Sequence, residues 1–221
     1  MKHLRQYIRQ ILLTEGMNTA ALFPEDVVVV IDTEADTEVM IHYAVVDTST
    51  GEPHYIRVSD RIKDLDGNRI YGKVEIYSLP ENYDVGPCSG AWAVGNSRAA
   101  SGWGPLLYDV AIEWATQNAA GLIPDRTSVS DSAEAVWRYY MQNRKDVTAH
   151  QLDDPIDTLT SEKEDNCDQE VAGGYRWGSP SLFRKENPEN PDWMGSPLSK
   201  RYTKEPTTIN ALKAAGKLVM L

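Results

Sequence analysis

The chain has 221 residues, of which 41% are hydrophobic and 25% are charged, and its formal net charge is −11. This composition is that of an ordinary globular protein, long enough for one well-buried domain with extensions or for two small domains. The acidic balance argues against non-specific nucleic-acid binding, and no apolar run approaches the roughly 18–20 residues that a membrane span requires.

A basic amphipathic segment opens the chain. At helical spacing, one face carries Leu4, Ile8, Ile11 and Leu12, and the other carries Lys2, Arg5 and Arg9. The apolar run at 11–13 is far shorter than the roughly 7–15 residues of a secretory signal core. We therefore expect residues 1–17 to form a separate amphipathic segment, with an ordinary helix packed on the domain as the alternative.

Strand-like patterns follow from residue 27 to residue 79. The continuous apolar run at 27–32 predicts a buried strand, and the β-rich stretches 38–47 and 53–58 flank a turn, which predicts an antiparallel hairpin. Further strands are expected at 69–79 and at 90–94, the second of them ending near Val94.

The next stretch alternates helix and strand. Residues 104–121 form the strongest helical pattern, with a buried face expected at Leu106, Leu107, Val110, Trp114 and Ala115. A short buried strand is predicted at 121–125. A second helix is predicted at 130–144, preceded by Ser and Asp residues that are typical of helix caps.

The last seventy residues have a different texture. Residues 164–197 are rich in Pro, Gly, Asn and charge, so we expect a largely irregular extension, which four aromatic anchors could pin to a surface: Tyr175, Trp177, Phe183 and Trp193. A solvated acidic run is expected at Asp153, Asp154 and Asp157. A short capped helix followed by a small apolar stretch is predicted at 207–221.

The two cysteines, Cys88 and Cys167, lie far apart in the sequence. Their spacing requires no disulfide, so a reducing compartment is the default expectation. No histidine or cysteine stands at the spacing of metal ligands, and no metal site is expected.

A glycine-rich turn enters the first helix. Gly102 and Gly104 flank Trp103, and Pro105 occupies the first helical turn, where its missing N–H costs nothing. Glycines let a backbone approach a ligand closely, and the free N–H groups of a helix N-terminus suit an anion such as phosphate. The alternative interpretation is a plain turn that leads into a buried helix.

The order of elements over roughly residues 27–146 resembles the GNAT acyltransferase superfamily. Its signature, Arg/Gln-x-x-Gly-x-Gly/Ala between a strand and a helix, falls on residues 99–104. The resemblance implies an α/β (α+β) fold with a central mixed, mostly antiparallel sheet flanked by helices. It also implies acetyl-CoA or another acyl-CoA as cofactor, with loop amides on the pyrophosphate and pantetheine beside the preceding strand. The implied cofactor-binding residues are Val94, Arg98, Ser101, Gly102, Trp103 and Gly104.

The sequence departs from the family pattern in two places. Ala99 stands at the Arg/Gln position, with Arg98 one residue early, and the closing strand pair of the sheet is not visible after Asp146. Backbone amides can still bind phosphate without that side chain.

The resemblance also supplies catalytic candidates. Tyr139 and Tyr140 are candidates for the hydroxyl that protonates the departing thiolate, and Glu75 or His42 for the base that deprotonates the amine. The structural alternatives are a core-facing helix for the tyrosines and outward alternation of polar residues for Glu75 and His42.

Three further segments, 101–115, 121–140 and 196–219, resemble proteins of tailed bacteriophages, a family with a GNAT-like fold and no settled substrate. The opening segment is similar to phage capsid-targeting sequences, which are cut after a Leu/Ile-x-Glu pattern. Residues 13–15 fit this pattern, and so do residues 79–81. The resemblance implies a location in the host cytoplasm or the virion interior.

We thus expect three regions: an N-terminal segment at 1–17, a GNAT-like domain at 18–149 and a polar extension at 150–221. The leading hypothesis is an acyl-CoA-dependent N-acyltransferase that acts on an unknown amine. The alternative is a non-catalytic GNAT-like component of the virion head, or a binder of host proteins, whose tail contacts the partner. A hydrolase has little support, because no G-x-S-x-G elbow exists.

Overall fold

The computed structural model describes residues 27–47, 49, 54–57, 72–79, 85–99, 103–156, 158–172 and 192–221. The expected segment 1–17 lies outside these residues, as do Asp157 and three of the four expected anchors, Tyr175, Trp177 and Phe183. The chain divides into two compact units: unit 1 comprises Met1–Tyr77, Gly95–Trp114 and Pro206–Leu221, and unit 2 comprises Ser78–Val94 and Ala115–Glu205. No helix among the described residues has the length and apolar character to cross a membrane.

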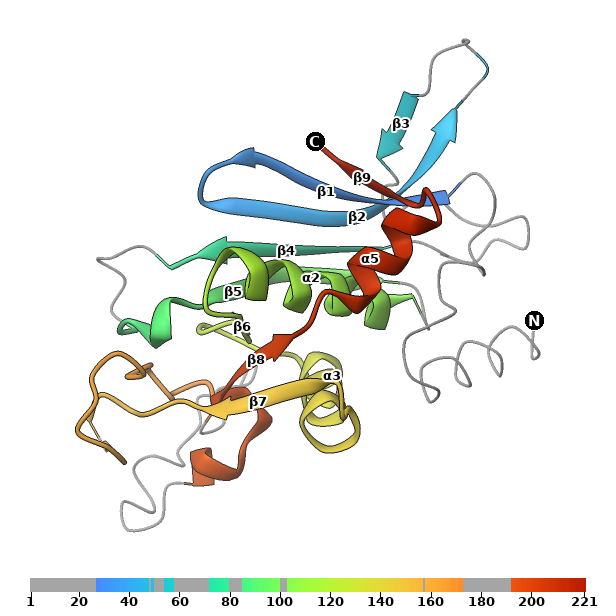
Figure 1. The fold of residues 1–221 in the computed structure, drawn as a ribbon. Coiled ribbons are helices and arrows are strands. Elements are labelled where there is room, and N and C mark those ends of the chain that lie inside the picture. Colours follow the sequence, from blue (N-terminus) through green and yellow to red (C-terminus); the bar gives the residue numbers. More distant parts are fainter. Residues whose placement is uncertain are drawn as a thin grey trace. The chain divides into compact units, whose positions relative to one another are not determined.

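Unit 1 is built on a mostly antiparallel sheet (Figure 1). Strands β1 (Val27–Ala35) and β2 (Glu38–Asp47) form a hairpin in which Val30 lies opposite His42. β2 also pairs antiparallel with β3 (His54–Arg57) and with β4 (Gly72–Ser78). The expected hairpin around the turn at 48–52 and the expected strand ending near 79 are therefore confirmed.

A parallel strand from the C-terminus completes the sheet of unit 1. The apolar stretch after the last helix forms β9 (Leu218–Met220), which pairs with β1 at Val29, Val30 and Ile31. The backbone bonds Val29 N–H to Lys217 O and Leu221 N–H to Ile31 O continue this pairing at 2.8 and 3.0 Å. The sequence predicted the apolar stretch but not its strand partner.

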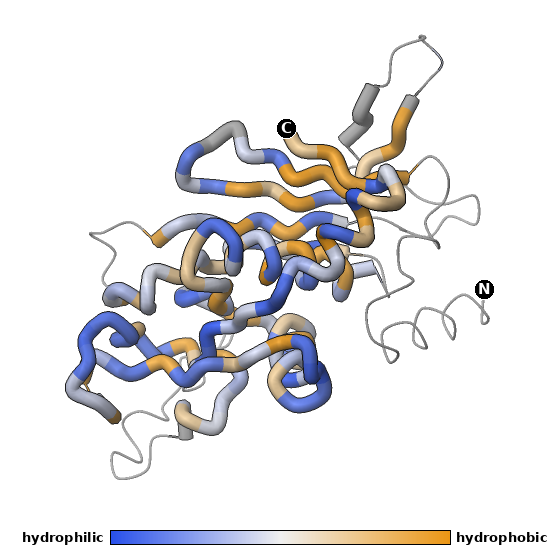
Figure 2. Tube along the Cα trace, viewed as in Figure 1, coloured by the Kyte–Doolittle hydropathy of each residue, from blue (hydrophilic) through white to orange (hydrophobic). Residues whose placement is uncertain are grey.

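The core of unit 1 follows from the apolar runs of β1 and β2, which Figure 2 shows as almost continuously hydrophobic. Both faces of these strands are buried, as expected for a run without alternation. One face carries Val28, Val30 and Ala44, against which Val46 and Val219 pack. The other face carries Val27, Val29, Ile31, Ile41 and Tyr43, all at most 1% exposed.

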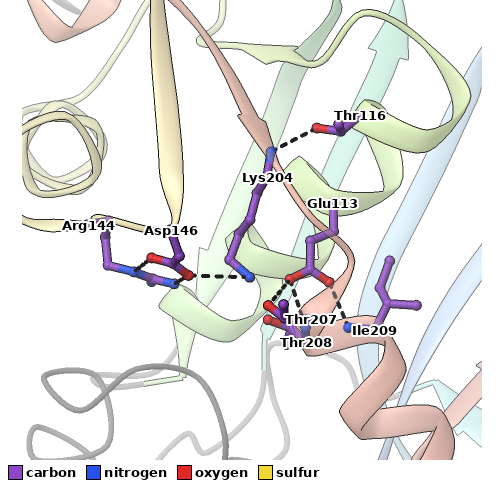
Figure 3. A network of polar contacts seen from close by, with 8 residues as sticks. All are labelled: Glu113, Thr116, Arg144, Asp146, Lys204, Thr207, Thr208 and Ile209. Atoms are coloured by element: carbon purple, nitrogen blue, oxygen red, sulfur yellow. Dashed lines mark hydrogen bonds and ion pairs between the residues drawn. The ribbon is translucent and has the colours of Figure 1, made fainter.

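Two helices accompany this sheet. The strongest helical pattern forms α2 (Gly104–Asn118), and all five residues of its expected apolar face are buried. The C-terminal pattern forms α5 (Thr207–Ala214). The buried Glu113 carboxylate of α2 caps α5, because it accepts hydrogen bonds from Thr208 N–H at 2.8 Å and Ile209 N–H at 2.7 Å (Figure 3). A glutamate from another helix thus supplies the cap that Pro206 lacks.

Unit 2 contains the first residues of β5 (Trp92–Ala99) and the short strand β6 (Leu122–Ile123), which run parallel. β8 (Lys200–Lys204) lies antiparallel to β6, and β7 (Val147–Gln151) lies antiparallel to β8. Two expectations are corrected here. β5 continues five residues beyond Val94, and a closing strand pair does follow Asp146, because its second strand comes from the distant residues 200–204.

Helix α3 (Asp131–Asn143) matches the second predicted helix. The hydroxyl of Ser130 accepts a hydrogen bond from Ala133 N–H at 3.3 Å and caps its first turn. Trp137 and Tyr140 face inward, and Trp137 stacks on Tyr202 of β8 with ring centroids 4.7 Å apart. The Tyr202 hydroxyl donates to Pro197 O at 2.7 Å, which fixes the turn before β8.

We expected the acidic run in the segment 152–172 to be solvated. The burial of its described members, Asp153 and Asp154, corrects that expectation. Asp153 is 1% exposed and Asp154 is fully buried. The Asp153 carboxylate accepts hydrogen bonds from the N–H groups of Asp154, Leu159 and Thr160 at 2.6–2.8 Å, so it organises the loop rather than facing water. Cys88 and Cys167 form a buried disulfide, a bond that their spacing in the sequence did not require.

The buried Arg126 also ties this segment into unit 2. Its guanidinium donates to the carbonyl oxygens of Pro124, Asp168 and Leu198 at 2.6–3.3 Å. Of the four expected anchors, Trp193 is described and is 4% exposed, so its burial agrees with an anchoring role.

Candidate functional site

The candidate site lies in unit 1, where β5 ends and α2 begins. Arg98, which is exposed, and Gly104, the first residue of α2, belong to this unit, whereas Val94, which is 5% exposed, belongs to unit 2. Ser101 and Gly102 of the predicted signature lie outside the described residues. The structure therefore brings the strand and the helix of the signature into one unit and describes both ends of the connecting turn.

Trp103, the residue before α2, is held by a tyrosine of β2. The Tyr43 hydroxyl donates a hydrogen bond to Trp103 O at 2.7 Å, and the two rings meet edge to face with centroids 5.1 Å apart. Burial raises the pKa of Tyr43 well above its ordinary value, and the negative charge of Asp109 adds to this effect. The hydroxyl therefore stays protonated and acts as a donor at all ordinary pH values.

A hydrogen bond between two hydroxyl groups joins β5 to α2. Ser97 Oγ lies 2.9 Å from the Tyr108 hydroxyl, one turn into α2. Burial raises the pKa of Tyr108, and the bond to Ser97 opposes this shift. The Ser97–Tyr108 bond thus joins β5 to α2, and the Tyr43–Trp103 bond joins the residue before α2 to β2.

Gly72 lets β4 lie directly against the end of β5. A Cβ atom at Gly72 would stand 2.5 Å from Arg98 O and 2.6 Å from the Ala99 Cα, so any side chain would push the strands apart. The Ala99 methyl group would in turn lie 3.5 Å from a Cβ at Gly104. The small residues Gly72, Gly104 and Ala99 therefore allow β4, β5 and α2 to pack closely at this point.

The first turn of α2 contains no acidic residue. At the N-terminus of any helix the first N–H groups have no partner within the helix, and the helix dipole carries partial positive charge there.

In unit 2, the parallel β5–β6 ladder is short. Its register joins Trp92 with Leu122 and Ala93 with Ile123, and β6 ends there while β5 continues to Ala99. The two strands therefore stop pairing one residue before Val94, the position expected beside pantetheine.

The two candidate bases lie in unit 1 on the sheet face opposite to Tyr43. Register pairs His42 with Lys73 and Met40 with Glu75, and alternation along β2 turns Tyr43 to the other face. Lys73 Nζ forms an ion pair with Glu75 Oε1 at 2.6 Å. His42 is 3% exposed, and its Nδ1 lies 3.0 Å from Tyr43 O.

The tyrosine candidates of α3 differ in their surroundings within unit 2. Tyr140 is 1% exposed, packs against Trp137 and Tyr139, and lies beneath the Arg144 guanidinium at 5.2 Å. Tyr139 is half-buried. Of the two, Tyr139 is the one whose ring is partly accessible.

Sequence reasoning did not find Tyr43, Ser97, Tyr108 or Gly72. Tyr43 is 60 residues from Trp103, and its alternation in β2 is that of an ordinary core residue. The Ser97–Tyr108 pair follows from β5 running past Val94, which the sequence pattern did not predict. Among the described residues, no group of three or more His, Cys, Asp or Glu residues could hold a metal ion.

The described residues define a mixed α/β protein with a mostly antiparallel sheet. No protein-family model, no curated protein and no solved structure matches the chain.

Proposed function

We propose that the protein is a GNAT-like, acyl-CoA-dependent N-acyltransferase that acts on an unknown amine. The observation that carries this proposal is the end of the β5–β6 ladder after Ala93 and Ile123, followed by the entry of β5 into α2 through a glycine-rich turn. Parallel strands that part in this way leave backbone groups of β5 available to an amide-bearing arm such as pantetheine.

The strand pair β7–β8 supports the same proposal. It is antiparallel, and β8 lies beside β6, so unit 2 has the closing strands whose apparent absence from the sequence weakened the resemblance. The source in tailed bacteriophages, and a location in the host cytoplasm or virion interior, belong to this proposal as well.

Catalysis in this proposal relies on positioning and on backbone amides. The amine nitrogen attacks the thioester carbonyl, the C–S bond breaks, and the departing thiolate takes a proton from a hydroxyl group. The half-burial of Tyr139 and the full burial of Tyr140 favour Tyr139 as that donor. Glu75, which forms an ion pair with Lys73 at 2.6 Å, is the candidate for the base that takes the proton of the amine.

A non-catalytic role in the virion or in binding a host protein is the second candidate. Ala99 at the Arg/Gln position and the enclosure of Tyr140 in the core favour it. In this case the turn before α2 is structural, and partner contacts come from the extension.

Calorimetric titration with acetyl-CoA tests the proposal. We expect micromolar binding by the wild type and loss of binding by Gly102→Trp, which places an indole in the glycine-rich turn. Gly195→Trp is the matched control, because a Cβ at Gly195 meets no atom within 4 Å. Absence of binding by the wild type, or equal binding by Gly102→Trp, would overturn the cofactor assignment and favour the non-catalytic role.

A further inference from the structure

We propose that one face of the β7–β8 strand pair binds the phosphate group of a ligand, with the Arg201 guanidinium as its principal contact. The proposed site lies wholly in unit 2 and contains no residue of the glycine-rich signature. It is therefore independent of the proposed acyltransferase activity.

The register of β7 and β8 divides their side chains between two faces. His150 lies opposite Arg201, and partners in an antiparallel pair point to the same side. The neighbouring pair on this face joins Thr148 with Thr203, so all four side chains are polar. The other face carries Tyr202, whose ring stacks on a side chain of α3. The polar face is thus turned away from α3, and its side chains are half-buried or exposed.

Arg201 on this face is a half-buried cation without a counter-charge. Its Nη1 donates to the carbonyl oxygen of Ala120, and no described carboxylate forms an ion pair with it. Two other arginines of unit 2 differ in this respect. Arg144 bonds to both carboxylate oxygens of Asp146, and the buried Arg126 donates to three carbonyl oxygens. Cations that are withdrawn from water are normally paired, so the surroundings of Arg201 favour an anion supplied by a ligand.

The guanidinium of Arg201 also has an unused edge. Nε is buried and has no hydrogen-bond partner, and Nη2 forms no hydrogen bond to a described residue either. The N–H groups of Nε and Nη2 point in parallel, and such a fork binds two oxygens of one oxyanion. A buried donor without an acceptor costs free energy, which an oxyanion at this edge would recover.

The loop before β6 holds this guanidinium in place. Gly121 has a φ of +124°, and a Cβ there would stand 2.6 Å from Tyr202 O, so only glycine lets the loop pass this close to β8. The close passage puts Ala120 O within reach of Arg201 Nη1. A donor that is held in advance loses less conformational entropy when a ligand binds.

Two neighbours of Arg201 complete the proposed site. His150 Nε2 lies 2.9 Å from Thr203 Oγ1. Burial lowers the pKa of His150, and the positive charge of Arg201 adds to this effect, so the imidazole is neutral near pH 7 and the guanidinium carries the charge. The polar groups thus come from both strands, which suits the three terminal oxygens of a phosphate better than the two coplanar oxygens of a carboxylate.

The experiment titrates the whole chain with inorganic phosphate, methyl phosphate and acetate at constant ionic strength, and follows the imidazole signals of His150 by NMR. We expect the wild type to bind phosphate with a millimolar dissociation constant and acetate at least roughly tenfold more weakly. Arg201→Gln should weaken phosphate binding by at least about tenfold. Arg138→Gln is the matched control, because it removes the same charge from an exposed arginine of α3 and should leave the affinity unchanged.

The remaining outcomes are equally decisive. Absence of phosphate binding by the wild type, or equal weakening by Arg201→Gln and Arg138→Gln, would overturn the site. Acetate binding as tight as that of phosphate would overturn the phosphate assignment. Methyl phosphate that binds as well as inorganic phosphate supports a phosphorylated ligand, and much weaker binding of the ester supports the free ion. If Arg201→Gln fails to fold, Thr203→Val tests the same site, with a roughly threefold loss of phosphate affinity expected and no loss counting against it.

Discussion

The β1–β2 hairpin of unit 1 and the segment 152–172 of unit 2 are held in different ways. The hairpin buries apolar side chains on both faces, and its strands are paired over their length. The segment contains no strand or helix, is largely hydrophilic in Figure 2, and is held by a disulfide and by carboxylates that bind backbone N–H groups. In the hairpin, side chains are buried because they are apolar. In the segment 152–172, side chains are buried because each has a specific bonding partner.

This difference determines how each region responds to change. A hydrophobic region loses more stability as more side-chain volume is removed, by an amount that depends on how far the site can collapse around the cavity. A region held by specific pairs loses most when one partner is deleted, because the other partner stays buried and unsatisfied. The following predictions test this contrast.

The largest effect is expected for Cys88→Ala combined with Cys167→Ala. The disulfide spans 79 residues, and removal of such a cross-link costs about 4 kcal/mol through the entropy of the unfolded chain. Urea unfolding of the double variant should match that of the reduced wild type. Equal stability of the oxidised and reduced wild type would contradict the prediction.

Hydrogen exchange distinguishes the regions in the same sample. After reduction, we expect faster exchange at Cys167 N–H and Asp168 N–H, which bond to Asp153 O and Val85 O. Exchange in β1 should be unaffected until the unit unfolds. Uniform acceleration over both regions would mean that the disulfide supports more than its own unit.

The second effect concerns the hairpin. Ile41→Ala removes a side chain with no exposed surface from β2 and should destabilise the protein by about 3 kcal/mol. The loss should be the same with and without reductant, because it does not depend on the disulfide. Ile41→Val is the matched smaller substitution, and its thermal melt should show a loss of stability of about 1 kcal/mol.

The two regions also differ in what the sequence could predict. Apolar runs and helical spacing indicated β1, β2, β4, α2 and α3, because these signals are local. The glycine-rich turn and the residues of the proposed cofactor site were predicted from local pattern as well, and of these Ser101 and Gly102 lie outside the described residues. The parallel β9 and the late strand β8 were missed, since their partners are distant in the chain.

The burial of the segment 152–172 could not be predicted from the sequence, for a physical reason. Asp153, Asp154 and Cys167 are residue types that also occur in solvated loops, and no periodicity marks their burial. Asp153 and Asp154 are buried because their carboxylates accept hydrogen bonds from backbone N–H groups, and Cys167 is buried because it is bonded to the sulfur of Cys88, 79 residues away. Tyr43 was missed at the site for the same reason, because its partner is the carbonyl of Trp103.

The third prediction deletes one charge from the polar region. Asp153→Asn replaces the oxygen that accepts from Thr160 N–H by an amide group or turns it away, and should cost about 2 kcal/mol. Burial acts to raise the pKa of Asp153, but the three N–H donors outweigh it and lower the pKa. The cost should appear in chemical unfolding at pH 7. The exposed Glu162→Gln is the control and should change stability by less than about 0.5 kcal/mol.

The fourth prediction tests, within unit 1, how a buried residue held by specific partners responds to substitution. Glu113 is a buried polar residue of this unit, and its two oxygens accept from the first N–H groups of α5 (Figure 3). Glu113→Gln keeps one acceptor and should cost about 1.5 kcal/mol, with early fraying of α5 in hydrogen exchange. The exposed Glu205→Gln, just before α5, should be neutral. Neutrality of Glu113→Gln itself would show that packing alone holds α5.

The smallest effect is expected at the Asp146 ion pairs of unit 2. Arg144 donates to both carboxylate oxygens at 2.6 and 2.8 Å, and Lys204 Nζ lies 3.5 Å from Oδ2 (Figure 3). Burial acts to raise the pKa of Asp146, but Arg144 and Lys204 outweigh it, so the pKa lies below its ordinary value. The ionised form is thus favoured in the folded state. Its contribution is complete above the ordinary pKa near 4 and declines as pH falls through the lower folded pKa.

Solvent limits this contribution. The Asp146 side chain is 34% exposed, so screening should keep it below about 1 kcal/mol, in contrast to the buried Asp153. Asp146→Asn should therefore lower the melting temperature slightly at pH 7, less in high salt, and not at pH 2. A loss that is the same at all three conditions would show that Asp146 acts through packing. Specific pairing would then matter only where water is excluded, which is the distinction between the buried carboxylates of segment 152–172 and those at the surface.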